Sequence, residues 1–370
     1  MAFRISEMVG CDFPLFAFSH CRDVVAAVSR AGGFGVLGAS SFSPEQLELE
    51  LAWIDDHVGG KPYGVDVLIP ENQTVGREVT LEELAESITP RHRDFVLGLL
   101  RDNGITLDQD LVGGRGRPTT MPDVSEALMN VAFGHPIRLI ANALGIAPPE
   151  MIARGKASGV PVAALVGAKE HALRQVAAGV DILVAQGGEA GGHCGEVSTM
   201  VLVPEVVRAA PSTPVLAAGG IVTGRQMAGC MAMGAAGVWT GSVWLATTES
   251  ETSEVFREKM VAAKSRDTIR SKARTGKPSR QLRSSWHQAW EAEGAPAPLP
   301  MPLMSMLSTP AFTAIDRAAA AGNAAARDLS SYFVGQGVGL IDAVRPAASV
   351  VQSFKEEFAE ALADMTEMAG

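Results

Sequence analysis

The chain has 370 residues, of which 47% are hydrophobic and 19% charged, and its formal net charge at pH 7 is −10. This composition is sufficient for a large buried core and excludes a mostly disordered chain. The acidic balance argues against nucleic acid or an anionic membrane as the main partner, because both require a basic surface. We therefore expect one large globular domain with an appendage, and a small molecule as its ligand.

The chain also lacks targeting and metal-binding patterns. No stretch approaches the roughly 18–20 uninterrupted apolar residues that span a membrane, and the N-terminus carries Glu7 and no apolar signal core. The cysteines show no Cys-x-x-Cys spacing, which fits a reducing compartment and gives no expectation of a metal site. They are Cys11, Cys21, Cys194 and Cys230. These features predict a cytoplasmic protein without a membrane anchor.

Short apolar segments alternate with amphipathic helical segments along the chain. The predicted strands are 14–16, 35–37, 63–67, 138–142, 162–165, 181–184, 215–218 and 237–240. Helices predicted between them include 23–31, 149–158, 169–178 and 224–233. Such β–α alternation indicates a parallel sheet, and eight strands over about 250 residues predict an α/β fold of the (β/α)8 TIM-barrel type. A doubly wound open sheet is the alternative, disfavoured because no Gly-x-Gly-x-x-Gly opens the first helix.

Two regions interrupt this alternation. The first, at about 70–130, contains a charged helical segment at 81–103 and a Gly/Arg/Pro-rich loop at 113–118. The second, at about 250–325, is basic and helical and includes a proline-rich link. We expect a barrel over residues 1–250 that includes the first insertion, a helical lid or small domain over 251–325, and a C-terminal segment, 326–370, that packs back on the barrel.

The most informative stretch follows the sixth predicted strand. Residues 185–195 read Ala-Gln-Gly-Gly-Glu-Ala-Gly-Gly-His-Cys-Gly, with five glycines around one acid and one imidazole. Glycine adds no packing and costs backbone entropy on ordering, but it lets backbone N–H groups approach a ligand closely. We therefore predict a ligand-binding or active-site loop rather than a merely flexible surface loop.

The loops after the seventh and eighth predicted strands are also glycine-rich. Loops at these two places in a barrel often bind phosphate through bare backbone N–H groups. Gly219 and Gly220 exceed the need of a tight turn, and Gly220 and Gly241 permit close approach. Thr240 and Ser242 add hydroxyl donors. These loops predict a phosphate site.

Several polar side chains could complete such a site. His193 can take or give a proton near neutral pH, and Glu189 would either orient it or remain solvated. Gln186 ends a strand and can both donate and accept hydrogen bonds, as the edge of a heteroaromatic ring requires. Further candidates for the pocket, placed near the expected carboxyl ends of strands, are His20, Asp66 and His135.

The run Ala185-Gln186-Gly187-x-Glu189-Ala190-Gly191-Gly192-His193-x-Gly195 closely resembles the signature of the nitronate monooxygenase (2-nitropropane dioxygenase-like) family. Four other blocks also resemble that family, so the likeness covers most of the chain. They are 215–221, 234–242, 275–283 and 335–339.

The resemblance implies an FMN-dependent oxidoreductase on a TIM barrel, which oxidises alkyl nitronates with O2 to a carbonyl compound and nitrite. The cofactor-binding residues it implies are Gln186 at the isoalloxazine edge, with Gly191, Gly220, Thr240 and Gly241 along the ribityl chain and phosphate. It also implies that His193 acts as a base or electrostatic partner beside the substrate. The flavin carries the redox chemistry, and the protein positions and tunes it.

The sequence departs from the family pattern at two places. The first strand of the family is usually followed by Gln-Ala/Gly-Pro-Met, whereas residues 16–20 here read Phe-Ala-Phe-Ser-His, so Phe18 and His20 become substrate-pocket candidates. The third strand commonly ends in Asn, whereas this chain has Asp66. A carboxylate there would place negative charge beside the flavin and lower its reduction potential.

Two other functions stay open at this point. One is an NAD(P)H-dependent FMN reductase that resembles the enoyl and quinone reductases, which share the Glu-Ala-Gly-Gly-His run. The other is a barrel without flavin that binds a phosphate-bearing ligand. A homodimer is compatible with the sequence, and the sequence does not name the physiological substrate.

Overall fold

The computed structural model describes residues 2–69, 81–107 and 122–369, so the predicted loop at 113–118 lies outside the described residues. Eight parallel strands close into a barrel, which confirms the predicted TIM-barrel fold. In order around the barrel they are β1 (Leu15–Ser19), β2 (Phe34–Gly38), β3 (Tyr63–Val67), β4 (Ile140–Asn142), β5 (Val162–Val166), β6 (Ile182–Gln186), β8 (Val215–Ala218) and β9 (Gly237–Thr240). The β1 strand pairs with β9 and so closes the sheet.

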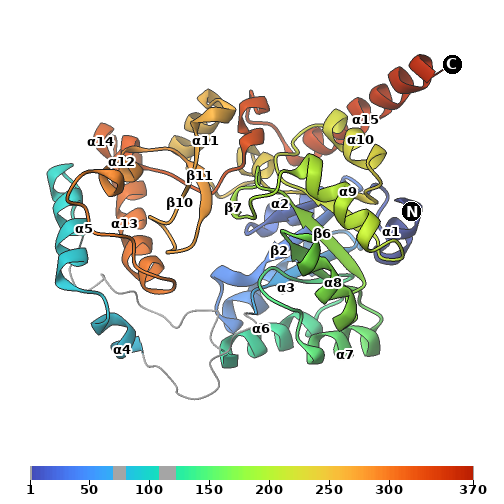
Figure 1. Cartoon of the computed structure of the whole chain (residues 1–370), viewed down its shortest axis with the longest axis horizontal. Helices are drawn as coiled ribbons and strands as arrows, with labels where there is room; N and C mark the ends of the chain where they lie inside the picture. The colour runs from blue at the N-terminus through green and yellow to red at the C-terminus, as the bar shows by residue number, and fades with distance from the viewer. Residues whose placement is uncertain (1, 70–80, 108–121, 370) are drawn as a thin grey trace.

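Amphipathic helices cover the outside of the barrel (Figure 1). They are α2 (Arg22–Arg30), α3 (Pro44–His57), α6 (Pro122–Gly134), α7 (Pro149–Ser158), α8 (Lys169–Ala178), α9 (Thr199–Ala209) and α10 (Gly224–Ala232). Two features fix where α3 begins: Ser43 and Gln46 form a capping box, and Pro44 opens the first turn. At the amino end of the barrel, α1 (Ala2–Val9) packs Ile5 and Val9 against the interior side chains.

A second hydrophobic core lies beside the barrel (Figure 1). It joins α4 (Leu81–Glu86) and α5 (Pro90–Asp102) from the first insertion to α12 (Ser285–Glu291), α13 (Leu303–Ala320) and α14 (Ala324–Leu329). The two interruptions therefore share one small core, whereas the sequence treats them as separate parts. Pro90, at the start of α5, explains why the single predicted helix at 81–103 becomes two.

The region 251–325 is not wholly helical, which corrects the sequence expectation. After α11 (Glu254–Ala262), strands β10 (Thr268–Ser271) and β11 (Ser279–Leu282) form an antiparallel pair. Strand β11 then pairs with the two-residue β7 (Gly192–His193), which belongs to the glycine-rich loop of the barrel. Backbone hydrogen bonds between strands distant in sequence produce this sheet, so no local sequence pattern predicts it.

The chain returns to the barrel through the segment 331–341 and ends in α15 (Ala347–Ala369). Helix α15 packs on α10 and α2, and its last turns project beyond the barrel (Figure 1). Among the described residues, no helix has both the length and the apolar character needed to cross a membrane.

Candidate active site

The carboxyl end of the barrel is lined by the side chains that point inward from the strands. Along β6, Ile182 and Val184 lie in the interior cluster, so the alternation places Gln186 inward at the strand end. The same alternation places Phe18 and Asp66 inward on β1 and β3. These three residues therefore share the mouth of the barrel, where active sites of this fold lie.

The small domain fastens the glycine-rich loop. Arg280 on β11 donates from Nε and Nη2 to the carbonyl oxygen of Gly188, at 3.0 and 2.7 Å. Arg270 donates to the carbonyl of Cys194 at 3.4 Å and pairs with Glu196 at 3.6 Å. The loop is thus held in shape by two arginines, whose roles the sequence reasoning missed. For Arg280 a signal was available in the sequence, because this residue belongs to the block 275–283.

His193 lies on β7, opposite Ser279 of β11. Its Nε2 is 2.8 Å from the hydroxyl oxygen of Thr275, and Thr275 donates its own proton to the carbonyl of Lys277 at 3.0 Å. Nε2 is therefore the donor to Thr275, and Nδ1 keeps the lone pair. The residue as a whole is solvent-exposed. Loss of hydration against the small domain, and then the nearby Lys277 charge, lower the pKa of His193, so its neutral form dominates at neutral pH.

Glu189 is half-buried, and its hydrogen bonds tie it to α9 rather than to His193. Its Oε2 accepts hydrogen bonds from the backbone N–H and the hydroxyl of Thr199, both at 2.9 Å. Thr199 is the first residue of α9, so the carboxylate occupies the N-terminus of that helix, where negative charge is favourable. Its role is to brace the loop against α9.

Most glycines of the predicted phosphate loops are explained by close packing. Gly219 and Gly220 have φ of +110° and +71°, which only glycine adopts readily. A Cβ on Gly191 would lie 2.8 Å from the backbone of Val334 and Gly335. No larger residue would fit at these positions, so a ligand could contact only backbone atoms there. A Cβ on Gly337 would likewise press on the Gly220 carbonyl, so the returning chain holds the loops together.

Gly241 differs from these glycines, because a Cβ built on it would meet no atom within 4 Å. Its neighbour Ser242 accepts a hydrogen bond from the Gly335 N–H at 2.8 Å through Oγ, which leaves the hydroxyl proton able to donate. An open backbone next to a hydroxyl donor is suited to an anionic oxygen. This corner of the mouth therefore fits the phosphate of a flavin nucleotide.

The hydroxyl of Thr240 is not available to that phosphate, which corrects the sequence expectation of a donor there. It donates to the carbonyl of Phe16 at 3.0 Å and accepts from the indole N–H of Trp244 at 2.9 Å. Thr240 follows the inward-facing Trp239 and so points outward from the barrel. Its side chain joins β1 to β9, and only its backbone borders the mouth.

His20 follows directly after β1, at the carboxyl end of that strand. Its Nδ1 donates to the carbonyl of Gly38 on β2 at 2.8 Å, so Nε2 is the bare nitrogen. A Cβ on Gly38 would lie 2.7 Å from the rings of both His20 and Phe18. The two rings meet edge to face at 5.2 Å. They therefore fill the space over Gly38 in the mouth, and their place in a substrate pocket stays a prediction.

Asp66 lies in register with Gly38 on the neighbouring strand. It is 4% exposed, and its buried Oδ1 has no hydrogen-bond partner among the described residues. This burial raises the pKa of Asp66 to about 8. The carboxyl is therefore mostly protonated at neutral pH. The prediction of a negative charge beside the flavin is wrong for the protein without a bound ligand.

His135 is not part of the mouth, which corrects the sequence expectation. It precedes β4 and so lies at the amino end of the barrel, beside a cavity of about 600 Å³. Its ring contacts Asp55 at 2.7 Å and Glu48 at 3.3 Å, both on α3. In a parallel barrel, residues just before a strand lie opposite the active face. His135 ties α3 to the base of the barrel.

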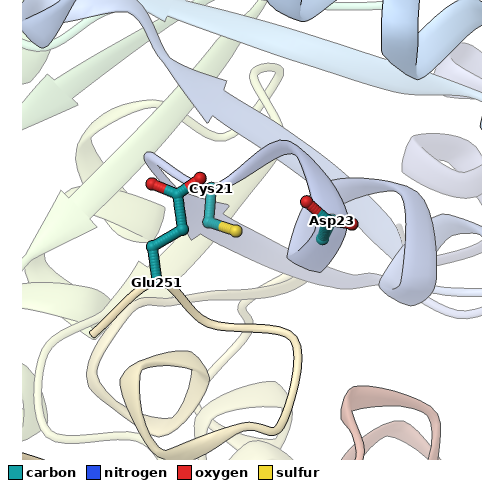
Figure 2. Close-up of side chains that lie close together, drawn as sticks. All are labelled: Cys21, Asp23 and Glu251. Carbon is teal, nitrogen blue, oxygen red and sulfur yellow. The ribbon is translucent and has the colours of Figure 1, made fainter. Parts of the chain in front are cut away.

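The described residues also bring together Cys21, Asp23 and Glu251, whose ligand atoms lie within 4.8 Å of one another (Figure 2). The Cys21 thiol is already 3.2 Å from the carbonyl of Glu249, to which it donates. Burial raises the pKa of the Cys21 thiol, with a smaller contribution from Glu251. The neutral thiol is a poor metal ligand, so we assign no metal to this group.

Comparison with known proteins supplies the family. The family model described as nitronate monooxygenase matches residues 17–357. The chain belongs to this family. A Mycobacterium tuberculosis protein named "Putative monooxygenase Rv1533" is 52% identical over 99% of this chain and 98% of its own length. A Staphylococcus saprophyticus protein named "Probable nitronate monooxygenase" is 30% identical over 76% of this chain and 79% of its own.

Two solved structures are similar to this chain over nearly its whole length. The nitroalkane oxidase of Streptomyces ansochromogenes superposes with a TM-score of 0.80 at 26% identity, over 99% of this chain and all of its own. FabK of Thermotoga maritima gives a TM-score of 0.72 at 27% identity, over 99% and 98% of the two chains. Like its family, this nitronate monooxygenase homologue is a flavin-dependent oxidoreductase.

Proposed function

We propose that this protein uses FMN to oxidise alkyl nitronates with O2, giving a carbonyl compound and nitrite. The observation that carries the proposal is the neutral imidazole of His193, which the small domain holds on the glycine-rich loop. Lys277 lies close enough to lower the pKa of that imidazole, and its positive charge favours an anionic substrate. A nitronate is such an anion.

The residues present fit FMN. Gly241 and Ser242 offer an open backbone and a hydroxyl donor for the phosphate. Gln186 would contact the edge of the flavin ring, and the backbones of Gly191, Gly219 and Gly220 would border the ribityl chain. When bound, the flavin supplies the electron transfer that no side chain can perform.

The chain's own residues handle binding and protons. His193 accepts a proton through Nδ1 when the substrate is a neutral nitroalkane, since Nε2 is committed to Thr275. Phe18 and His20 bound the other side of the mouth and limit the size of the substrate. The arginine contacts of the loop keep His193 in place during this transfer.

The proposal is tested with purified holoprotein and nitroethane nitronate or propionate 3-nitronate. Aerobic turnover should yield nitrite and consume O2, and the nitronate should reduce the bound flavin in the absence of O2. Failure of every nitronate to reduce the flavin would exclude this substrate class while leaving the flavin assignment intact.

Replacing Gly241 with Leu should weaken FMN binding by about tenfold or more, because the side chain would occupy the space of the phosphate. Folding should be preserved, since the site is open in the protein itself. FMN fluorescence quenching measures the affinity. The matched control is Gly134→Leu at the end of α6, where a Cβ also meets no atom within 4 Å. Equal FMN affinity in both variants would contradict the assignment of Gly241.

NAD(P)H-dependent flavin reduction is the second candidate. The structural likeness to FabK spans nearly the whole chain, and the Glu189 to His193 run is of the type shared with flavin-dependent reductases. Anaerobic mixing of the holoprotein with NADH or NADPH distinguishes the two functions. Rapid bleaching of the flavin by a nicotinamide, with none by nitronates, would favour the reductase.

A further inference from the structure

Asp66 is the one buried carboxyl in the mouth of the barrel, among the residues that the structure describes. Asp66 is the last inward-facing residue of β3, and its Oδ1 has no hydrogen-bond partner there. Burying a polar group without a partner costs stability. An inward-facing acid of this kind has a physical reason to persist if a ligand supplies the missing partner.

Among the described residues, no charge acts on Asp66 strongly enough to stabilise a carboxylate. Burial is the one cause of its raised pKa, so neither a cation nor another acid acts on it strongly. The neighbouring strands place Gly38 and Ala141 beside it, and Phe18 and His20 lie over Gly38. Among the described residues, His20 is the titratable group on this side, and burial lowers its pKa, so the neutral form dominates at neutral pH and above.

We propose that Asp66 binds the flavin as a neutral acid, donating a hydrogen bond from its protonated carboxyl to an acceptor atom of the isoalloxazine ring. This inference rests on the proposed FMN site and adds a residue and a protonation state to it. The pyrimidine part of the ring carries carbonyl oxygens and a ring nitrogen that accept, together with one imide N–H that donates. A neutral carboxyl offers both a donor and an acceptor, whereas a carboxylate offers only acceptors.

The proposal predicts that FMN binding weakens when Asp66 loses its proton. Ionisation would remove the donated hydrogen bond and direct negative charge at the carbonyl oxygens of the ring. Because the pKa of the unliganded group is about 8 and the hydrogen bond favours the protonated form, the loss should begin above that pH. Burial lowers the pKa of His20 from its ordinary value, so the titration of His20 lies below this range and does not contribute.

The experiment compares the wild-type protein with Asp66→Asn and Asp66→Leu. The amide retains a donor and an acceptor at every pH, and the leucine removes both. Between about pH 6.5 and pH 9.5, the wild-type dissociation constant for FMN should rise by about tenfold relative to Asp66→Asn, the equivalent of one strong hydrogen bond. Asp66→Leu should bind FMN about tenfold more weakly than Asp66→Asn at both pH values. Infrared spectra of the wild-type holoprotein should show the carbonyl stretch of a protonated carboxyl, absent from Asp66→Asn.

The outcomes separate this inference from the FMN proposal. The role of Asp66 would be overturned if the dissociation constant for FMN had the same pH dependence in the wild type and Asp66→Asn, or if Asp66→Leu bound FMN as tightly as the wild type. Either result would leave the proposed FMN site intact. Failure of the wild-type protein to bind FMN at any pH would overturn both. Circular dichroism at each pH confirms that the variants compared are folded.

Discussion

Substitution of His193 with asparagine is expected to lower the turnover of neutral nitroalkanes by about 100-fold or more, the contribution of a positioned general base. Asparagine keeps a polar side chain near Thr275 but has no group that accepts a proton at neutral pH. The FMN content should be unchanged, because the contacts that hold the loop run through Arg280 and Arg270. Steady-state oxygen consumption with nitroethane measures the effect.

A preformed nitronate makes this test specific. It needs no proton removal, so His193→Asn should affect its turnover far less than that of the neutral nitroalkane. The matched control is His171→Asn on the exposed surface of α8, which should behave as wild type. Equal losses for the two substrates would mean that His193 positions the substrate and does not accept its proton.

The pH dependence of the wild-type enzyme provides a related check. The pKa of His193 is lowered in the folded protein. Its imidazole is therefore neutral, and able to accept a proton, at lower pH than an ordinary histidine, whose pKa is about 6.5. In a plot of kcat/KM for nitroethane, the acid limb should therefore lie below that value. The limb should be missing in His193→Asn.

Substitution of Asp66 with asparagine is expected to stabilise the FMN-free protein progressively as the pH rises. The folded-state pKa of about 8 lies above the ordinary value of 3.8. Between these values the unfolded chain is ionised while the folded chain stays protonated, so wild-type stability falls with rising pH and levels off above about pH 8. At about 1.4 kcal/mol per pH unit, the difference between the two proteins should grow by roughly 4 kcal/mol from pH 4 to pH 7.

Urea unfolding of the FMN-free proteins at several pH values measures this difference. Comparing its growth with pH cancels the constant cost of burying an unpaired amide. Asp56→Asn on the exposed face of α3 is the control and should show no such growth. A difference that stays constant from pH 4 to pH 8 would show that Asp66 is ionised in the folded protein.

The Asp66 predictions describe a compromise between stability and binding. A buried acid without a partner weakens the empty protein, and the same acid is suited to donate a hydrogen bond to a bound ring. Polar groups that lower stability commonly mark binding sites for this reason. The stabilised Asp66→Asn variant should therefore also be the one whose FMN binding is not weakened at alkaline pH.

The barrel itself was predictable from local pattern. Strands 63–67, 215–218 and 237–240 were placed with the bounds observed, because their apolar residues are bounded by turn-forming glycines and polar residues. The glycine-rich loop followed from its composition alone. Strand order then follows from the parallel alternation.

The composition of the small domain was not predictable in the same way. The first insertion and the region around α13 lie about 200 residues apart in sequence, yet one hydrophobic core holds both. The pairing of β7 with β11 likewise depends on a contact between His193 and Ser279. Such long-range contacts leave no periodic signal in either segment.

The sequence by itself determined the class of fold, the loop that carries His193 and the resemblance to the family, because these depend on residue type and spacing along the chain. Only the tertiary structure decided which of the chosen side chains are available for chemistry. The hydroxyl of Thr240 is occupied by hydrogen bonds with Phe16 and Trp244. His135 lies at the amino end of the barrel, opposite the active face. Asp66 is neutral because burial penalises charge. Burial and hydrogen-bond partners arise from packing across the fold, and they set the protonation and orientation of a side chain.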